Sequence, residues 1–262
     1  MKTMKRIGHV GAVLAVALFA AALPAHAQAP AAAPVTALEP AALAALSSMG
    51  AYLRTLKAFQ VEAAVTDEDV LDDGQKVQYG GTSTILARMP NGLRAEVSND
   101  RHERLFLYDG KRFTLFGKRL NFFATVPAPP TIGQLADTLD AEYGLSVALA
   151  DLFRWGPPGW TTEGITAATV IGPSVVGGTT CAQYAFRTDE IDWQIWIQKG
   201  DFPLPRRLVI TDRTDEARPQ HTAVYTWNLA PSFNDAAFTF AAPAGAGQVV
   251  LAKLKAAAAA AK

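Results

Sequence analysis

The sequence contains 262 residues, of which 50% are hydrophobic, and its 24 Lys and Arg residues balance its 24 Asp and Glu residues. A surface that binds nucleic acid needs an excess of clustered Lys and Arg, which a chain with balanced charges does not provide. Nucleic acid is therefore excluded as a partner. A chain of this length is typical of one domain, or at most of two small ones.

The N-terminus has the pattern of a secretory signal peptide. A positively charged start precedes the apolar run Val10–Leu23, and residues 25–27 provide an Ala-x-Ala cleavage site. The run is shorter than the roughly 20 residues of a membrane-spanning helix, and no second long run follows. We therefore expect residues 1–27 to be cleaved, which leaves a slightly acidic periplasmic chain with no membrane span. No cysteine stands at the cleavage site to carry a lipid anchor.

Two segments precede the first strand. Residues 28–38 are rich in Ala and Pro without a periodic pattern, which is typical of a disordered leader. Glu39-Pro40 opens the next segment, and Pro is tolerated in the first turn of a helix. Apolar side chains then recur every three or four residues from Leu43 to Leu56, which predicts an amphipathic helix of about four turns.

From Phe59 the apolar residues recur at every second position, which is typical of strands. Turn residues such as Asp72-Asp73-Gly74 separate one strand from the next. The strands predicted here are Phe59–Thr66, Val77–Arg88, Leu93–Val97, Glu103–Tyr108, Arg112–Phe116 and Leu120–Val126. Because the connections are short, neighbouring strands are expected to pair in order. Gly80-Gly81 indicates a bulge or bend in the second strand.

A Pro-rich segment ends these strands, and two helical segments follow at Thr131–Tyr143 and Val147–Arg154, with Thr131 as a candidate cap. Strands then resume. They are Ile165–Ile171, Thr180–Arg187, Asp192–Gln198, Arg206–Thr211 and His221–Leu229. Residues 233–240, in which Phe238 and Phe240 alternate around Thr239, are expected to close the domain. The Ala-rich residues 242–262 are expected to be a loose tail.

This order of elements predicts an α+β fold. A sheet of about 11 antiparallel strands has to curl or split. We therefore expect a strongly curved sheet, an incomplete barrel, whose concave face is covered by the N-terminal helix and the mid-chain helical insertion. Residues 39–241 would form this single domain.

Large apolar side chains are dense on the predicted strands, and alternation decides which face each one takes. Trp193 shares a face with Ile195, whereas Trp196 points to the outer face, where a protein partner could meet it. Arg206 and Arg207 are expected on opposite faces, and one of them could meet an anionic headgroup. The candidate ligand-binding residues are Phe106, Tyr108, Phe113, Phe122, Tyr184, Phe186, Trp193, Ile195 and Leu208. The pattern leaves open whether they line a pocket or form a filled core.

The residue types that carry catalysis or bind metals form no recognisable motif. His102 and His221 have no nucleophile motif beside them, and Cys181, the single cysteine, alternates within a strand like a packed thiol. The acidic run Asp67–Asp73 has Leu71 where a calcium loop needs a ligand, so we expect a solvated hairpin tip. The sequence therefore predicts no catalytic residue, no metal site and no cofactor.

Several short runs are similar to a known family. They are Leu93–Val97, Leu107–Lys111, Ala128–Ile132, Tyr143–Leu145, Ala150–Phe153, Trp193–Ile197 and Pro203–Leu208. Together they resemble the predicted periplasmic proteins called domain of unknown function 2092 (DUF2092). The order of elements also resembles the lipoprotein-carrier fold of periplasmic lipoprotein chaperones and their outer-membrane receptors. This resemblance implies an incomplete barrel with helices over an apolar cavity, and it supplies no catalytic residues.

The leading hypothesis is an exported binding protein without catalysis. It would hold an apolar or acylated ligand, of the lipid or lipoprotein type, between the curved sheet and the mid-chain helices. The alternative is a periplasmic protein-interaction or envelope-sensor module with a filled core, no ligand and an envelope protein as its partner. An enzyme is the least favoured class, because the constellations that catalysis needs are missing.

Overall fold

The computed structural model describes residues 38–145, 151–155 and 161–254. The signal peptide expected at residues 1–27 and the Ala/Pro-rich leader lie outside the described part of the chain. Residues 146–150, where the second mid-chain helix was expected to begin, and residues 255–262 also lie outside it.

Three α-helices, one short 3-10 helix and twelve strands make up the described part of the chain. The helical elements are α1 (Pro40–Thr55), α2 (Ile132–Tyr143), α3 (Asp151–Arg154) and the 3-10 helix η1 (Asp235–Phe238). The strands are β1 (Ala58–Val70), β2 (Lys76–Arg88), β3 (Gly92–Asn99), β4 (Glu103–Tyr108), β5 (Arg112–Gly117), β6 (Phe122–Pro127), β7 (Ala167–Val176), β8 (Thr179–Arg187), β9 (Ile191–Gln198), β10 (Pro205–Asp212), β11 (Gln220–Asn228) and β12 (Gly247–Gln248). The predicted strands from Phe59 to Leu229 are all present, with bounds that differ by a few residues.

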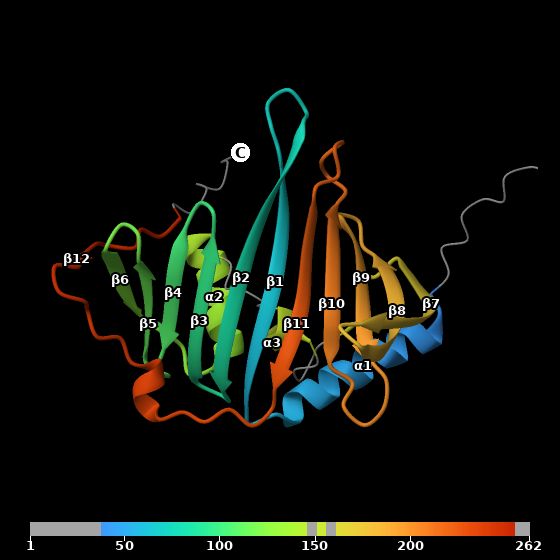
Figure 1. Cartoon of the computed structure of the whole chain (residues 1–262), viewed down its shortest axis with the longest axis horizontal. Coiled ribbons are helices and arrows are strands. Elements are labelled where there is room, and N and C mark those ends of the chain that lie inside the picture. Colours follow the sequence, from blue (N-terminus) through green and yellow to red (C-terminus); the bar gives the residue numbers. More distant parts are fainter. Residues whose placement is uncertain (1–37, 146–150, 156–160, 255–262) are drawn as a thin grey trace, which may run out of the picture. The chain divides into compact units, whose positions relative to one another are not determined.

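The strands form one sheet in the order β12-β6-β5-β4-β3-β2-β1-β11-β10-β9-β8-β7. Two meanders, β1–β6 and β7–β11, are joined where β1 pairs with β11. Neighbouring strands are antiparallel, except that β12 runs parallel to β6. Figure 1 shows the curved, unclosed sheet, with β12 and β7 at its two ends. The structure confirms the α+β class and the incomplete barrel.

The long hairpin β1–β2 lies in the middle of the sheet. The two strands pair without interruption along their whole length, and Gly74 takes a φ of 84° in the turn. Of the bulge or bend expected at Gly80-Gly81, the bulge is therefore wrong. Glycine at position 81 has a different role, because a Cβ there would lie only 2.8 Å from the carbonyl oxygen of Ser98 on β3.

The helices begin and end as their sequences predict. Pro40 lies in the first turn of α1, and the Thr131 side chain caps α2 by accepting a hydrogen bond from the Gln134 backbone N–H at 3.3 Å. Gly144 ends α2 in the left-handed conformation, at a φ of 63°. The buried residues of α1 and α2 recur mainly at intervals of three or four positions. They include Ala42, Leu46, Met49, Leu53, Ile132, Leu135, Ala136 and Leu139. Each helix therefore presents one apolar face to the core.

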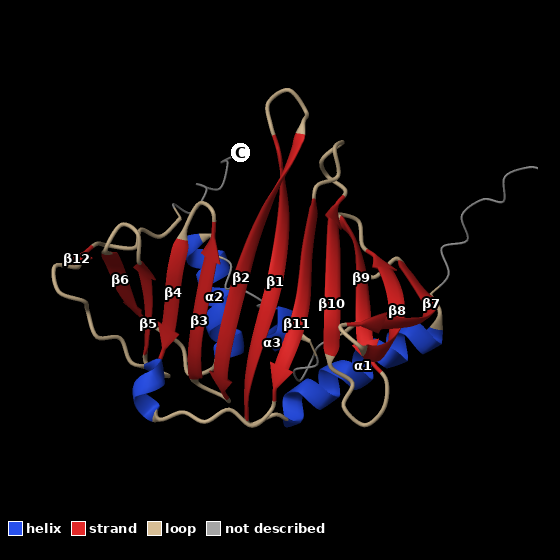
Figure 2. Cartoon of the chain, viewed as in Figure 1, coloured by secondary structure: helices blue, strands red, loops and turns tan. Residues whose placement is uncertain are grey.

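One large apolar cluster joins the helices to the concave face of the sheet. Every second residue of a strand points to the same face of the sheet. Val61, Trp193 and Leu208 belong to this cluster, so the residues that alternate in step with them on each strand face the concave side. Figure 2 shows α2 and α3 on the same side of the strands. The residues of opposite parity form two smaller clusters on the outer face.

The last described residues, 235–254, form a segment that we call the C-terminal strap. Residues 233–240, which were expected to close the domain, include the 3-10 helix η1 at Asp235–Phe238. This turn places the Phe238 ring against the backbone of Gly92, where the ring is buried. Burial of one large ring, rather than alternation, determines the conformation here.

The prediction of a loose tail from Ala242 onward is wrong for residues 242–254. Gly247-Gln248 pairs with β6, and the backbone N–H of Leu254 donates to the Glu142 carbonyl at 2.7 Å. On the outer face, Phe240 and Ala246 pack against the apolar cluster Leu105, Leu107 and Phe116 of β4 and β5. These strands need an apolar cover, and the strap supplies it.

Trp196 lies on the outer face, as predicted, but it is not open to a partner. Only 7% of the residue is exposed, because the Arg207 guanidinium covers its ring at 4.8 Å and its indole N–H donates to Ser174 Oγ at 3.1 Å. The expectation that Arg206 and Arg207 take opposite faces is wrong. A β-bulge ahead of Arg207 adds one residue to β10, so Arg206 also reaches the outer face, where it donates to Gln198.

Candidate ligand-binding site on the concave face

An apolar cavity of about 190 Å3 lies on the concave face, between strands β9 and β10 and the residue that follows α3. It is lined by Trp155, Ile191, Trp193, Leu208 and Ile210, and we call it the tryptophan cavity. Alternation brings the four strand residues to one face, and the pairing of Trp193 with Ile210 places them side by side.

Stacked aromatic rings support one side of the tryptophan cavity. The Trp155 and Trp193 rings lie at 17° to each other, with centroids 6.4 Å apart. The Phe186 ring lies 4.3 Å from the Trp193 ring, at 20°, and comes from the paired position on β8. Stacked rings stabilise one another by more than the area they bury. Phe186 therefore helps to hold Trp193 in its position.

Arg54, at the end of α1, holds the segment that carries Trp155. Its guanidinium donates to the backbone carbonyl oxygens of Leu152 and Phe153, the latter at 3.0 Å. Helix-end carbonyls lack partners within the helix, so these bonds satisfy them. Burial lowers the pKa of Arg54 below its ordinary value. The position of Trp155 thus depends on α1 as well as on α3.

A second cavity, of about 380 Å3, lies toward the far end of β1 and shares Ile210 with the first. We call it the polar cavity, because its other lining residues are mostly polar. They are Asp67, Glu68, Asp69, Tyr79, Asn99, Arg101, His102, Asp212, Pro219, Gln220 and His221. An apolar cavity and a polar one therefore meet at a single side chain.

The main charged groups of the polar cavity are paired with one another. His221 Nδ1 lies 2.6 Å from Asp67 Oδ1, across the pairing of β1 with β11. Arg101 bonds Asp69, and its guanidinium carbon lies 3.6 Å from the centroid of the Tyr79 ring. Glu68 and Asp212 also line the cavity, so its carboxylates outnumber its cationic side chains, and it suits a ligand end that donates hydrogen bonds.

His102 also lines the polar cavity. Burial lowers the pKa of its imidazole, and the positive charges of Arg104 and Arg119 lower it further. Its Nε2 lies 3.4 Å from Asn99 Nδ2. A neutral imidazole has one donor and one acceptor nitrogen, so His102 is equipped to bind an uncharged polar group.

Five of the nine residues predicted for the ligand site lie in or beside the tryptophan cavity. Trp193 and Leu208 line it. Ile195 is fully buried and pairs with Leu208, and Phe186 stacks on Trp193. Tyr184, which pairs with Ile195, is half-buried and packs against the same core. The structure therefore brings these five together.

The other four predicted residues lie elsewhere. Phe106, Tyr108 and Phe113 are buried in the core on β4 and β5. The Tyr108 hydroxyl donates to the Pro129 carbonyl at 2.5 Å, and burial raises its pKa to about 12. Phe122 is half exposed on β6, opposite β12. The concave face is thus filled around β4 and β5, whereas the tryptophan cavity lies at β9 and β10.

Three lining residues of the tryptophan cavity were not predicted from the sequence, namely Trp155, Ile191 and Ile210. Ile191 and Ile210 alternate with Trp193 and Leu208, so the strand pattern contained a signal for them. Trp155 lies outside the strands, and only the packing of α3 brings it to the cavity.

The polar cavity also went unrecognised in the sequence. The run Asp67–Asp73 was expected to form a solvated hairpin tip, which is wrong for its first part, because Asp67 and Asp69 lie on β1 and line the cavity. Asp67 and His221 are 154 positions apart in the chain. No local pattern could show that they pair.

The thiol of Cys181 lies apart from both cavities. Cys181 is fully buried on the outer face, and burial raises the pKa of its thiol. Among the described residues, no group of three or more His, Cys, Asp or Glu side chains could hold a metal ion. No helix in the described part of the chain is long and apolar enough to cross a membrane.

The fold and the cavities together define the class of protein. It is an open half-barrel of antiparallel strands, with helices on its concave face and small cavities between the helices and the strands. The chain belongs to the family described as predicted periplasmic protein (DUF2092), which matches residues 42–252. This membership confirms the family resemblance found in the sequence and assigns the chain to the periplasm.

Several solved structures are similar to the chain but share little sequence with it. LprF from Mycobacterium bovis is 14% identical, with 80% of this chain and 99% of that chain covered and a TM-score of 0.44. Lipoprotein LppX from Mycobacterium tuberculosis is 11% identical, with 75% and 100% covered and a TM-score of 0.40. A LolA superfamily protein from Nitrosomonas europaea is 11% identical, with 76% and 97% covered and a TM-score of 0.35. Similarities this remote carry no conclusion about function, and no curated protein sequence matches the chain.

Proposed function

We propose that this protein is an exported binding protein, without catalysis, that holds the apolar end of an amphipathic ligand in the tryptophan cavity. The observation that carries the proposal is the apolar lining of Trp155, Ile191, Trp193, Leu208 and Ile210 around about 190 Å3. Ligand sites are mostly apolar with a few polar groups at one end. The adjoining polar cavity provides that polar end.

The size of the cavities limits the ligand. The tryptophan cavity is smaller than the roughly 300–1,000 Å3 of typical ligand sites, whereas the polar cavity, of about 380 Å3, falls within that range. A short acyl or aromatic group therefore fits better than a whole lipid chain. Ile210 lines both cavities, so it would contact the ligand at the point where the apolar part of the ligand meets its polar end.

The polar cavity supports binding over catalysis. The pair His221–Asp67 has the orientation of a base and the carboxylate that orients it. A nucleophilic mechanism also needs a hydroxyl or thiol beside the base. The described lining contains no Ser, Thr or Cys. Its one hydroxyl side chain, Tyr79, has its ring covered by the Arg101 guanidinium, and Cys181 is buried on the other face of the sheet.

Calorimetric titration of the mature protein with saturated fatty alcohols of increasing length, from butanol to dodecanol, tests the proposal, because an uncharged hydroxyl end suits the polar cavity. We expect binding to be tightest at a short or medium length. Trp193→Ala should abolish it. Trp196→Ala, a matched change of the same residue type on the opposite face of β9, should leave it intact. Absence of binding at every length, or equal binding by the two variants, contradicts the proposal.

A protein-interaction module is the second candidate, and one observation favours it. End strand β7 exposes Ile171 and Val175, at 53% and 67%. Leu38 and Glu39 contact this edge only at Ala168 and Val170 within the described part of the chain. An extended segment of an envelope protein could add to the remaining edge.

This candidate ranks second because Pro173 and the bulge after Val170 blunt the edge of β7. Capture from a periplasmic extract by the wild type and by Val175→Asp tests it. One stoichiometric protein that the variant fails to retain would support the interaction module. Equal retention by both would exclude the edge of β7 as the contact surface.

A further inference from the structure

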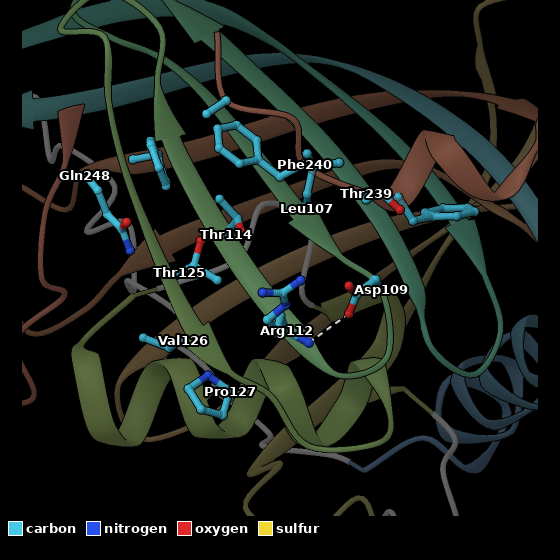
Figure 3. Close-up of a pocket in the computed structure, with 13 residues that line it drawn as sticks. Leu107, Asp109, Arg112, Thr114, Thr125, Val126, Pro127, Thr239, Phe240 and Gln248 are labelled. Carbon is cyan, nitrogen blue, oxygen red and sulfur yellow. Dashed lines mark hydrogen bonds between the residues drawn. The ribbon is translucent and has the colours of Figure 1, made fainter. Parts of the chain in front are cut away.

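A larger cavity, of about 460 Å3, lies on the outer face, between the C-terminal strap and strands β4, β5 and β6. Figure 3 shows its lining, with Thr239 and Phe240 of the strap on one side and Gln248 of β12 on another. This volume falls within the range of roughly 300–1,000 Å3 that is typical of small-molecule sites. Nothing in the proposed concave-face function uses this cavity.

The outer-face cavity has an apolar wall that is held in place. Leu107, Phe123 and Phe240 belong to the outer-face cluster, and the rings of Phe123 and Phe240 lie 4.9 Å apart. The strap that carries Phe240 is tied at both ends. Asp235 forms a salt bridge with Arg88, and Lys253 forms one with Glu142. The wall is therefore part of the folded structure.

Polar groups gather at the other side of this cavity. Thr114 and Thr125 pair across β5 and β6, with their hydroxyl oxygens 2.8 Å apart. One hydroxyl donates to the other, so the second keeps a hydrogen that it can donate to a ligand. Gln248 adds an amide group.

Arg112 provides the positive charge of this cavity. It lies two residues before Thr114, so both side chains take the same face of β5, and Figure 3 shows it between Asp109 and the threonine pair. Its guanidinium forms no hydrogen bond or ion pair with any described residue. Guanidinium groups bind carboxylate and phosphate oxygens in a two-point geometry.

Asp109 limits the charge of the ligand. Its Oδ1 already accepts the backbone N–H groups of Lys111 and Arg112, at 2.9 and 2.8 Å. One guanidinium beside one carboxylate gives the cavity little net charge. A singly charged carboxylate therefore fits this site better than a doubly charged phosphate.

We propose that the outer-face cavity binds a small molecule that carries one carboxylate on a compact apolar body. Arg112 holds the carboxylate, Thr125 and Gln248 donate to its oxygens, and the apolar body lies against Leu107, Phe123 and Phe240. This site is separate from the tryptophan cavity, since the two lie on opposite faces of the sheet.

Ligand-observed NMR and calorimetry with phenylbutyrate and its uncharged amide, phenylbutyramide, test the proposal. We expect phenylbutyrate to bind the mature protein and the amide to bind at least tenfold more weakly. Arg112→Gln should weaken phenylbutyrate binding by roughly tenfold to a hundredfold, the range for a lost charged hydrogen bond. Lys111→Gln, the neighbouring exposed cation outside the cavity, should bind like the wild type.

A second pair of variants separates the two sites. Thr125→Val should weaken phenylbutyrate binding, whereas Trp193→Ala should leave it unchanged, because Trp193 lies on the concave face. Circular dichroism establishes that each variant is folded. The proposal is overturned if phenylbutyrate does not bind, if the amide binds equally well, or if Arg112→Gln and Lys111→Gln behave alike. If only Trp193→Ala abolished binding, phenylbutyrate would be bound in the tryptophan cavity, and this result would also overturn the proposal.

Discussion

The rings of Trp155 and Trp193 lie 6.4 Å apart at 17°, and they join the helical insertion to the second meander of the sheet. Trp155 follows α3, whereas Trp193 belongs to β9. Their contact is the place where the cover of the concave face meets the strands. The tryptophan cavity therefore depends on the helical insertion as well as on the sheet.

Trp193→Ala should lower the free energy of unfolding by about 3–5 kcal/mol, because it removes a large buried ring and leaves a void. Urea denaturation followed by circular dichroism measures this loss. Leu120→Ala is the control, since 76% of Leu120 is exposed, and it should change the free energy by less than about 0.5 kcal/mol. Similar losses in both variants would contradict the packing described for Trp193.

Arg54→Met should loosen α3. The change removes the hydrogen bonds to the carbonyls of Leu152 and Phe153, and bonds from a charged donor contribute roughly 1.5–3 kcal/mol each. We expect a lower free energy of unfolding and faster amide hydrogen exchange at residues 151–155. Lys57→Met, at an exposed cation shortly after α1, should alter neither measurement. Unchanged exchange in the Arg54 variant would show that α3 is held by packing alone.

Local alternation predicted much of the fold but not what covers each face. It placed Trp196 on the outer face correctly, because side chains in a strand alternate whatever lies around them. It could not show that Arg207 and Ser174 cover the ring. The bulge in β10 also reversed the face of Arg206, since one added residue changes the parity of all residues before it.

Long-range pairing limited what could be predicted of the candidate sites. The polar cavity exists because β1 pairs with β11 in a register that places Asp67 opposite His221. The outer-face cavity exists because the strap returns to β6, through Gly247. Neither contact leaves a signal within a short stretch of sequence. The tryptophan cavity was partly predictable, because strand alternation alone places Trp193 and Leu208 on the concave face.

Gly81→Ala should destabilise the protein, whereas Gly80→Ala should not. A Cβ at position 81 would lie 2.8 Å from the Ser98 carbonyl oxygen and 3.0 Å from the Asn99 Cβ, and a Cβ at position 80 would meet nothing within 4 Å. Forcing atoms into a packed site costs about 1–3 kcal/mol. Chemical denaturation of the two variants gives the comparison. Equal stability would argue against the close approach of β3 to β2.

Asp192→Asn should lower stability at neutral pH and have little effect in strong acid. Arg187 forms two hydrogen bonds with Asp192. These bonds, with the nearby positive charges of Arg187, Arg213 and Arg218, hold the pKa of Asp192 below its ordinary value, although burial opposes the change. The folded-state pKa is thus lower than the unfolded-state pKa of about 3.9.

A lowered carboxyl pKa stabilises the folded state above the unfolded-state pKa, and this stabilisation is lost as the pH falls from about 4 through the folded-state pKa. Because Asp192 and Arg187 are partly exposed, at 26% and 42%, we expect a loss of only about 1–2 kcal/mol at pH 7 in Asp192→Asn. Urea denaturation between pH 7 and pH 2 should show the wild type and the variant converging in acid. Asp201→Asn, in an exposed turn, should follow the wild type throughout. A difference between Asp192→Asn and the wild type that stays constant down to pH 2 would mean that Asp192 stabilises the start of β9 by packing rather than by charge.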